Sequence, residues 1–380
     1  MRVAIFSDTY VPEINGVAKT LKRLTDYFDQ HNIEYKLFVP ENRSSVPDIS
    51  DVERLASIPF LLYPQCRLAF PNTAHLKKSL HDFSPDLIHI ATPFNVGLYG
   101  QYYGRKYNIP MVASYHTHFD RYLEYYNLSL LINWLWRYME WFHRPFEKVY
   151  VPSESTKDKL TELNIHPNID IWGRGVNHQF FSPSKRTVKV REKYKIKEKY
   201  ILLYVGRVSA EKDVDVALDA FHSLSPEIYD QTHLMIVGDG PLLAHMKKSN
   251  NEKITFAGFL KGSDLAEVYA SSDVFLFPSS TETFGNVVLE AASSGLPVIG
   301  ADAGGIQHLV KQNVTGYLCA PKDKGSFVEQ TEKLLVNDDL RKQMGYQARQ
   351  FALTQSWDEI LSELVMGYER VLTKKVQALA

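Results

Sequence analysis

Cysteine is scarce in this sequence of 380 residues, which contains only Cys66 and Cys319. The two lie far apart and fit no metal-binding spacing, so a reducing, cytoplasmic setting is the simple interpretation. Long apolar runs are also missing, because no stretch approaches the roughly 20 residues that a membrane span needs. Only four apolar residues follow Arg2, which is too few for a signal peptide.

An excess of charge of one sign is missing as well. The formal net charge is −1, which gives no overall attraction to nucleic acid. The chain also lacks the Gly-x-Gly-x-x-Gly fingerprint of dinucleotide-binding folds, which argues against an NAD-dependent oxidoreductase. The lone Gly238-Asp-Gly240 before Pro241 is explained by a tight turn.

What the sequence does contain is a regular alternation of short apolar runs and amphipathic segments. Runs at 2–6, 86–90, 111–114 and 148–151 predict buried strands, with helical patterns between them at 17–28 and 94–107. The pattern then restarts at 200–205 and continues at 233–237, 254–256, 274–277 and 297–299. This alternation predicts two consecutive α/β domains, each with a doubly wound parallel sheet.

The predicted boundaries follow from this restart. We expect a first domain over 1–183, a linker over 184–199, a second domain over 200–357 and a final helix over 358–380. The linker is rich in lysine and arginine. A solvated helix face is the plain interpretation of this basic run, and an electrostatic contact with anionic lipid is the alternative.

The sharpest chemical motif is a pair of carboxylates, Glu282 and Glu290, separated by seven residues. Glu282 follows a predicted strand and a polar loop, and a helix begins after Gly285. The free amides and positive dipole end of such a helix suit a diphosphate. Glu282 would then lie beside a sugar, and Glu290 could reach a ribose hydroxyl. Taken alone, this spacing also fits an ordinary strand, loop and helix with surface glutamates.

Two further loops follow predicted opening strands. Arg207 and Lys212 come directly after the strand at 200–205, at the end where doubly wound sheets bind ligands. Two cations there could neutralise a pyrophosphate leaving group. Asn15-Gly16 follows the first strand, and a glycine at that helix start lets the backbone approach phosphate or sugar closely.

Alternating polar residues follow the strand at 111–114. His116, His118 and Asp120 could share one side of an extended loop. A solvated loop and a metal site are the alternatives, although no convincing further ligand set accompanies them. Downstream, the aromatic-rich helix at 133–142 is expected to pack in the core, with an apolar acceptor or a membrane interface as the alternative.

Together these motifs resemble the retaining glycosyltransferases of family 4, over essentially the whole chain. The resemblance implies the GT-B fold, with two Rossmann-like domains, a deep cleft between them and a final helix that crosses back to the first domain. It implies that Arg207 and Lys212 hold the donor diphosphate and that His116 lies beside the transferred sugar. The remaining implied donor contacts are Gly16, Glu282, Phe284, Gly285, Asn286, Val287 and Glu290.

The opening loop and the segment 114–120 are similar to those of a bacterial and plant branch of lipid mannosyl-, glucosyl- and sulfoquinovosyltransferases. We therefore expect metal-independent transfer from a UDP-hexose or GDP-mannose to a glycolipid or diacylglycerol, at the inner face of the membrane. Asn15, His118 and Asp120 are the acceptor-side candidates. No cofactor and no nucleic acid partner is expected. A soluble acceptor and a non-catalytic sugar-nucleotide sensor remain the alternatives.

Overall fold

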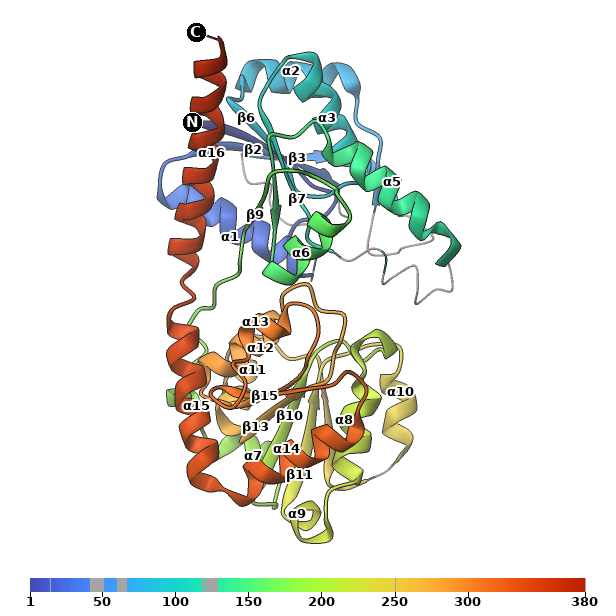
Figure 1. Ribbon diagram of the computed structural model, residues 1–380, viewed down its shortest axis with the longest axis vertical. Coiled ribbons are helices and arrows are strands. Elements are labelled where there is room, and N and C mark those ends of the chain that lie inside the picture. The colour runs from blue at the N-terminus through green and yellow to red at the C-terminus, as the bar shows by residue number, and fades with distance from the viewer. Residues whose placement is uncertain are drawn as a thin grey trace. The chain divides into compact units, whose positions relative to one another are not determined.

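The computed structural model describes residues 1–13, 15–41, 51–59, 67–117, 120, 129–249 and 251–379. The chain forms two compact units (Figure 1). Unit 1 comprises Met1–Gly173 and Trp357–Ala380, and unit 2 comprises Arg174–Ser356. Each unit is described by itself below.

Unit 1 is built on a seven-stranded parallel sheet with the order β3-β2-β1-β6-β7-β8-β9. Its strands are β1 (Arg2–Phe6), β2 (Glu34–Pro40), β3 (Val52–Leu55), β6 (Leu87–Ile90), β7 (Met111–Ser114), β8 (Lys148–Val151) and β9 (Ile169–Ile171). A small antiparallel ribbon joins β4 (Ser57–Pro59) to β5 (Arg67–Ala69). The helices are α1 (Gly16–Gln30), α2 (Thr73–Phe83), α3 (Asn95–Lys106), α5 (Ile132–His143), α6 (Glu154–Glu162) and α16 (Trp357–Leu379), with a 3₁₀ turn at Ser129–Leu131.

Helices cover both faces of this sheet, which is why every residue of the central strands β6 and β7 is buried. Val3 and Ile5 point to one face and pack in a core with residues of α1 and α16, which lie side by side in Figure 1. Ala4 and Phe6 point to the other face and pack with residues of α2, α3 and α5. The two-residue period of a strand therefore separates two cores.

Unit 2 has a six-stranded parallel sheet with the order β12-β11-β10-β13-β14-β15. Its strands are β10 (Tyr200–Val205), β11 (Thr232–Val237), β12 (Ile254–Gly258), β13 (Val274–Phe277), β14 (Val298–Ala301) and β15 (Gly316–Cys319). Its helices are α7 (Lys189–Tyr194), α8 (Val214–His222), α9 (Pro226–Asp230), α10 (Leu243–Met246), α11 (Gly262–Ser271), α12 (Asn286–Ser293), α13 (Ile306–Leu309), α14 (Lys324–Val336) and α15 (Asp338–Leu353). Short 3₁₀ turns occur at Pro183–Lys185, Ala210–Lys212 and Lys247–Ser249. The prediction of two parallel-sheet domains is confirmed.

The division between the units differs from the predicted boundary at residue 183. Residues 174–183 belong to unit 2, because hydrogen bonds fasten them there. The amide of Val176 donates to the Gln355 carbonyl at 3.1 Å. The Arg349 guanidinium donates to the carbonyl oxygens of His178 and Phe181, each at 2.8 Å.

The basic run at 184–199 is likewise part of unit 2 and not a free linker. Arg186 donates to the carbonyls of Ala270 and Ser272, and Arg191 donates to the carbonyls of Glu198 and Lys199. Lys193 pairs with an acidic side chain of α11 at 2.9 Å. These cations stabilise the packing of α7, which favours the plain interpretation of the basic run.

In each sheet, the chain changes once the side on which it adds new strands, and this change creates a topological switch point. In unit 1 the chain builds outward from β1 to β3 and then returns to the other side of β1 with β6. In unit 2 it builds from β10 to β12 and returns with β13. Loops at the carboxyl ends of such strand pairs diverge and leave room for a ligand. Among the described helices, none is long and apolar enough to cross a membrane.

Candidate active site

The loops after β10 and β13 lie at the same edge of the unit 2 sheet, because these neighbouring strands are parallel. Lys212 ends the first loop and Glu282 lies in the second. Their side chains form an ion pair, with Lys212 Nζ 2.6 Å from Glu282 Oε1 and each side chain 19% exposed. The two predicted site residues are therefore brought together from positions 70 residues apart.

Arg207 lies in the same loop as Lys212 and is more exposed. Its guanidinium is 3.7 Å from the Glu211 carboxylate, and 43% of its side chain is accessible. The buried phenol of Tyr204 donates to the Arg207 carbonyl at 3.0 Å and fixes the start of the loop. Arg207 is therefore a cation on an anchored backbone, with its head group open to a ligand.

Asp213, which the sequence analysis did not single out, ties the two loops together. Its carboxylate accepts hydrogen bonds from the backbone amide and the hydroxyl of Ser280, at 3.1 and 2.8 Å. The residue is 6% exposed and has a φ of +49°, a left-handed conformation that aspartate tolerates better than most side chains. Asp213 directly follows Lys212, so it fixes the spacing between the loops that carry Lys212 and Glu282.

The Glu282 loop is also shaped by glycines that follow β14. The Gly305 amide donates to the Glu282 carbonyl at 2.9 Å. A Cβ atom at Gly304 would lie 2.3 Å from the same carbonyl oxygen, and one at Gly305 would lie 2.4 Å from Phe284 Cα. Only glycine allows this approach of two backbones.

Helix α12 starts directly behind this loop. Gly285 precedes its first residue with a φ of +102°, and no side chain caps the helix. Asn286 and Val287 are its first two residues, so their amides have no preceding turn to bond to. Phe284 is 9% exposed and packs against the core of unit 2. The helix therefore presents an uncapped, positive N-terminus beside Glu282.

Glu290 lies on the next turns of α12, where Tyr269 of α11 contacts it. The phenol of Tyr269 donates to Glu290 Oε2 at 3.0 Å. Burial and the neighbouring carboxylate raise the pKa of Tyr269 well above its usual value, so it stays a donor. Tyr269 is a second residue of this site that sequence reasoning missed.

The Gly238-Asp-Gly240 segment is more than the tight turn that the sequence predicted. A Cβ atom at Gly238 would lie 1.8 Å from the Gly206 carbonyl oxygen, and one at Gly240 would lie 2.3 Å from that of Val208. The Val208 amide also donates to the Asp239 carbonyl at 3.0 Å. These glycines let the loop after β11 pack against the Arg207 loop.

In unit 1, Asn15 and Gly16 lie where predicted, at the start of α1. Asn15 caps the helix by accepting from the Ala18 amide at 2.8 Å, and its own amide donates to Thr9 at 2.7 Å. Gly16 is exposed in the first turn. Both polar atoms of the Asn15 side chain therefore make hydrogen bonds. Gly16 has no side chain that could cover the start of α1.

Asp8 occupies the switch point of unit 1, between β1 and β6. Its carboxylate accepts from the Thr92 hydroxyl at 2.6 Å and from the Val96 amide at the start of α3 at 2.8 Å. Its own amide donates back to the Thr92 hydroxyl at 2.7 Å. Burial raises the pKa of Asp8 to about 6, although these hydrogen bonds act in the opposite direction.

His116 follows β7 and is 8% exposed, with its ring 5.1 Å from the ring of Trp172 in an edge-to-face arrangement. Asp120 is buried and pairs with Lys159 of α6 at 2.5 Å. His118 lies outside the described residues. Within those residues, no group of three or more His, Cys, Asp or Glu side chains could hold a metal ion.

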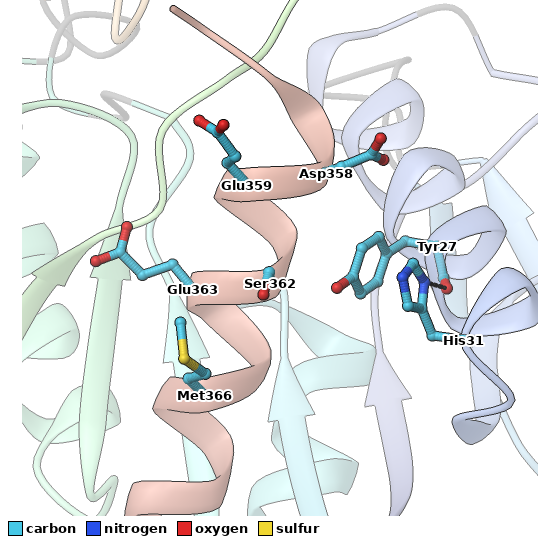
Figure 2. Close-up of a pocket in the computed structure, with 7 residues that line it drawn as sticks. All are labelled: Tyr27, His31, Asp358, Glu359, Ser362, Glu363 and Met366. Carbon is cyan, nitrogen blue, oxygen red and sulfur yellow. Dashed lines mark hydrogen bonds between the residues drawn. The ribbon is translucent and has the colours of Figure 1, made fainter.

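A shallow hollow in unit 1 contains none of the predicted site residues. It lies between α1 and α16 and is lined by Tyr27 and His31 together with α16 residues that include Asp358, Ser362 and Met366 (Figure 2). The His31 ring bonds to the carbonyl of Tyr27 at 2.9 Å. This hydrogen bond is local to the carboxyl end of α1.

Two protein families match this chain. Residues 14–180 match the family described as Glycosyltransferase Family 4, and residues 187–351 match Glycosyl transferases group 1. A GDP-mannose-dependent alpha-mannosyltransferase of Mycobacterium tuberculosis is 30% identical over 98% of this chain and 97% of its own length.

The chain belongs to glycosyltransferase family 4. An alpha-monoglucosyldiacylglycerol synthase of Streptococcus pneumoniae is 27% identical over 84% of this chain and 75% of its own length. Among solved structures, a sucrose-phosphate synthase from Thermosynechococcus elongatus aligns with a TM-score of 0.79 and 19% identity, covering 98% of this chain and all of that one. This glycosyltransferase has the GT-B fold, and it transfers a sugar from a nucleotide sugar.

Proposed function

We propose that this glycosyltransferase moves a hexosyl group, with retention of configuration, from a nucleotide diphosphate sugar to a hydroxyl of a membrane lipid. The observation that carries the donor half is the Lys212–Glu282 pair at the switch point of unit 2. A cation for the phosphates and a carboxylate for the sugar stand side by side there. The uncapped start of α12 follows within four residues.

The donor diphosphate is held by Arg207, Lys212 and the first amides of α12. These groups are fixed before the reaction, so they stabilise the negative charge that develops as the nucleoside diphosphate leaves. Fixed cations and helix amides of this kind take the part that a metal ion plays elsewhere. When phosphate oxygens approach Lys212, the ammonium group bridges them to Glu282.

The sugar and ribose are recognised by the two carboxylates. Glu282 accepts from sugar hydroxyls and favours positive character at the reacting carbon. Glu290, oriented by Tyr269, binds the ribose. The backbone of Phe284 and Gly285 lies beside the sugar, and the amides of Asn286 and Val287 donate to phosphate.

Unit 1 supplies the acceptor side and part of the donor contacts. Gly16 lets the start of α1 approach the donor phosphate, and His116 lies beside the transferred sugar. Asp120 is an acceptor-side candidate, because its Oδ1 atom is buried and has no hydrogen-bond partner among the described residues. Asn15 holds the loop that carries Gly16.

The lipid acceptor is supported by the exposed face of α5 and the turn before it. Trp134 and Trp141, seven residues apart on one face, are 69% and 53% exposed. Arg137 stacks over Trp134 at 5.9 Å, and Leu130 in the preceding turn is 93% exposed. Tryptophan rings alternating with arginine suit the headgroup level of an anionic bilayer, such as the inner face of a cell membrane.

The prediction of core packing holds for one face of this helix only. Met139, Phe142 and His143 are buried on that face. Helix α5 therefore packs on one side and exposes large aromatics on the other. The name of the pneumococcal relative states a diacylglycerol product, which points to the same class of acceptor.

A donor and acceptor screen tests the proposal. The purified protein is incubated with GDP-mannose or a UDP-hexose, with and without vesicles of diacylglycerol and anionic phospholipid, and released nucleotide and glycosylated lipid are measured. GDP-mannose comes first, because the relatives that match over nearly the whole chain are named for it. We expect vesicle-dependent transfer from one donor, which Glu282→Ala abolishes.

Two surface variants separate the acceptor from the donor half. Replacing Trp134 and Trp141 together by serine is expected to weaken vesicle binding and lipid transfer about tenfold or more, with donor binding unchanged. The control is Tyr346→Ser, which removes an aromatic side chain of unit 2 that is 61% exposed. If the double tryptophan variant and the Tyr346→Ser control both transferred the sugar to a soluble acceptor, the lipid proposal would be overturned. Nucleotide binding without any transfer would support the sensor alternative.

A further inference from the structure

Trp172 lies between the candidate histidine of the site and a second, deeply buried histidine. Its ring is 5.1 Å from that of His116 and 5.5 Å from that of His89, and neither pair is stacked face to face. Trp172 follows β9, whereas His116 follows β7 and His89 lies in β6. Trp172 thus brings rings from three segments that are separate in the sequence into contact.

The position of Trp172 is fixed by its surroundings. The residue is 1% exposed, and its amide donates to the Val151 carbonyl at 2.7 Å. It belongs to the core that contains Leu361, Leu364 and Tyr368 of α16. A bulky ring in a close-packed core has little freedom to turn, so it transmits the placement of α16 to its neighbours.

His89 is fixed as firmly, and again by α16. Its Nδ1 atom is 2.7 Å from the Tyr368 hydroxyl, and its Nε2 atom is 2.6 Å from the Ser114 hydroxyl. Burial lowers the pKa of His89 to about 3, so the ring stays neutral within these two hydrogen bonds. Ser114 ends β7 two residues before His116, which connects the same network to the strand that carries His116.

We infer that Trp172 is a positioning residue for His116, and that α16 contributes to the site through Trp172 and the His89–Tyr368 pair. The inference rests on the proposed place of His116 beside the transferred sugar. The edge of one ring against the face of the other restricts the rotation of the imidazole. Displacement of a reacting or supporting group by about 1 Å can cost two orders of magnitude in rate, so this restriction bears on kcat.

The test compares substitutions of Trp172 in the full chain with a matched core substitution. Trp172→Leu removes the aromatic contact, so we expect kcat to fall by about 10- to 100-fold. Trp172→Phe retains a smaller ring, so we expect a clearly smaller fall in kcat. The KM for the nucleotide sugar should stay within about twofold, because the donor phosphates are held by unit 2. The control is Phe28→Leu, a fully buried residue of the same core that is not in ring contact with His116.

A structural readout accompanies the kinetics. In histidine-labelled protein, the His116 ring protons should show a ring-current shift from Trp172 that is lost in Trp172→Leu and kept in Phe28→Leu; His116→Ala assigns the signal. The inference would be overturned if Trp172→Leu and Phe28→Leu lost kcat to the same extent and in proportion to their loss of thermal stability. An unchanged kcat in Trp172→Leu when His116→Ala abolishes transfer would also overturn it. Full activity of His116→Ala would instead remove the proposed role of His116, and with it this inference.

Discussion

The two sheets share the order of their first six strands, to which unit 1 adds β9, but their switch points hold different groups. In unit 1, the gap between β1 and β6 is closed by Asp8, which is 2% exposed and bonded to Thr92 and Val96. In unit 2, the gap between β10 and β13 holds the partly exposed ion pair of Lys212 and Glu282. The corresponding switch points therefore hold a buried, hydrogen-bonded carboxyl group in unit 1 and a partly exposed ion pair in unit 2.

The difference follows from what each charged group can bond to within its own unit. The Asp8 carboxylate has a hydroxyl and a helix amide as partners, so it acts as an internal cap for α3. Lys212 and Glu282 neutralise each other, and the neighbouring start of α12 has no side-chain cap. An anion that enters there gains a cation and free amides at once, which favours this edge as the donor site.

The largest effect that we expect comes from removing the positive charge of Lys212 at the switch point of unit 2. Lys212→Ala should lower kcat by about 100- to 1,000-fold, because it removes a fixed cation from the developing diphosphate charge. Steady-state kinetics with the best donor measures this loss. Lys212→Arg should recover part of the activity, since it keeps the positive charge.

The control for this substitution is a lysine of the same unit in a surface ion pair. Lys193 pairs with Asp264 at 2.9 Å, and both side chains are more than half exposed. Lys193→Ala should leave kcat unchanged, because an exposed pair of this kind contributes at most about 1 kcal/mol to stability. Equal losses in Lys193→Ala and Lys212→Ala would show that the position of the cation is irrelevant.

The next largest effect should come from Asp8 at the switch point of unit 1, and it should lower the free energy of unfolding. Asp8→Ala leaves the Val96 amide and the Thr92 hydroxyl without their buried acceptor, so we expect a loss of about 2–3 kcal/mol in the free energy of unfolding. Urea denaturation measures the loss, and calorimetric titration with GDP or UDP measures nucleotide binding. Nucleotide affinity should be kept in the folded variant; its loss at unchanged stability would contradict the comparison.

Much of this architecture could be predicted from the sequence, because strand cores leave a local signal. The apolar runs at 2–6, 111–114 and 200–205 coincide with β1, β7 and β10. Weaker strands such as β9 and β15 were not foreseen, since three or four residues carry little periodic signal. The predicted end of the first domain failed for a related reason: the bonds of Arg349 that fasten 174–183 span more than 160 residues.

The candidate site divides in the same manner. Arg207, Lys212, Glu282 and Glu290 stand in recognisable spacings, and the structure places them around one sheet edge. Asp213, Tyr269 and Trp172 stand in none, because each acts through a partner that is distant in the sequence. Gly304 and Gly305 look like an ordinary turn until the backbone of Glu282 is seen against them. Sequence patterns thus single out the charged candidate residues better than the residues that hold them in place.

The smallest effect concerns the pH dependence of the closed switch point. The pKa of Asp8 is raised to about 6 in the folded protein, above its ordinary value of 3.8. Between these values the folded state binds more protons than the unfolded state, so the contribution of Asp8 to stability grows as the pH falls. From pH 7 to pH 5 this gain should be about 1 kcal/mol.

Buried histidines oppose this gain, so a difference measurement is needed. Burial lowers the pKa of His89 to about 3 and that of His143 to about 4, and both therefore destabilise the fold as the pH falls below about 6.5. These contributions are the same in wild type and Asp8→Asn, which lacks the titrating carboxyl group. The stability of the wild type relative to Asp8→Asn, measured by urea denaturation, should increase by about 1 kcal/mol between pH 7 and pH 5. A stability difference that does not change with pH would show that Asp8 is already ionised in the folded protein at pH 5. The switch point of unit 1 would then hold a charged group, as that of unit 2 does, and the two would differ mainly in burial.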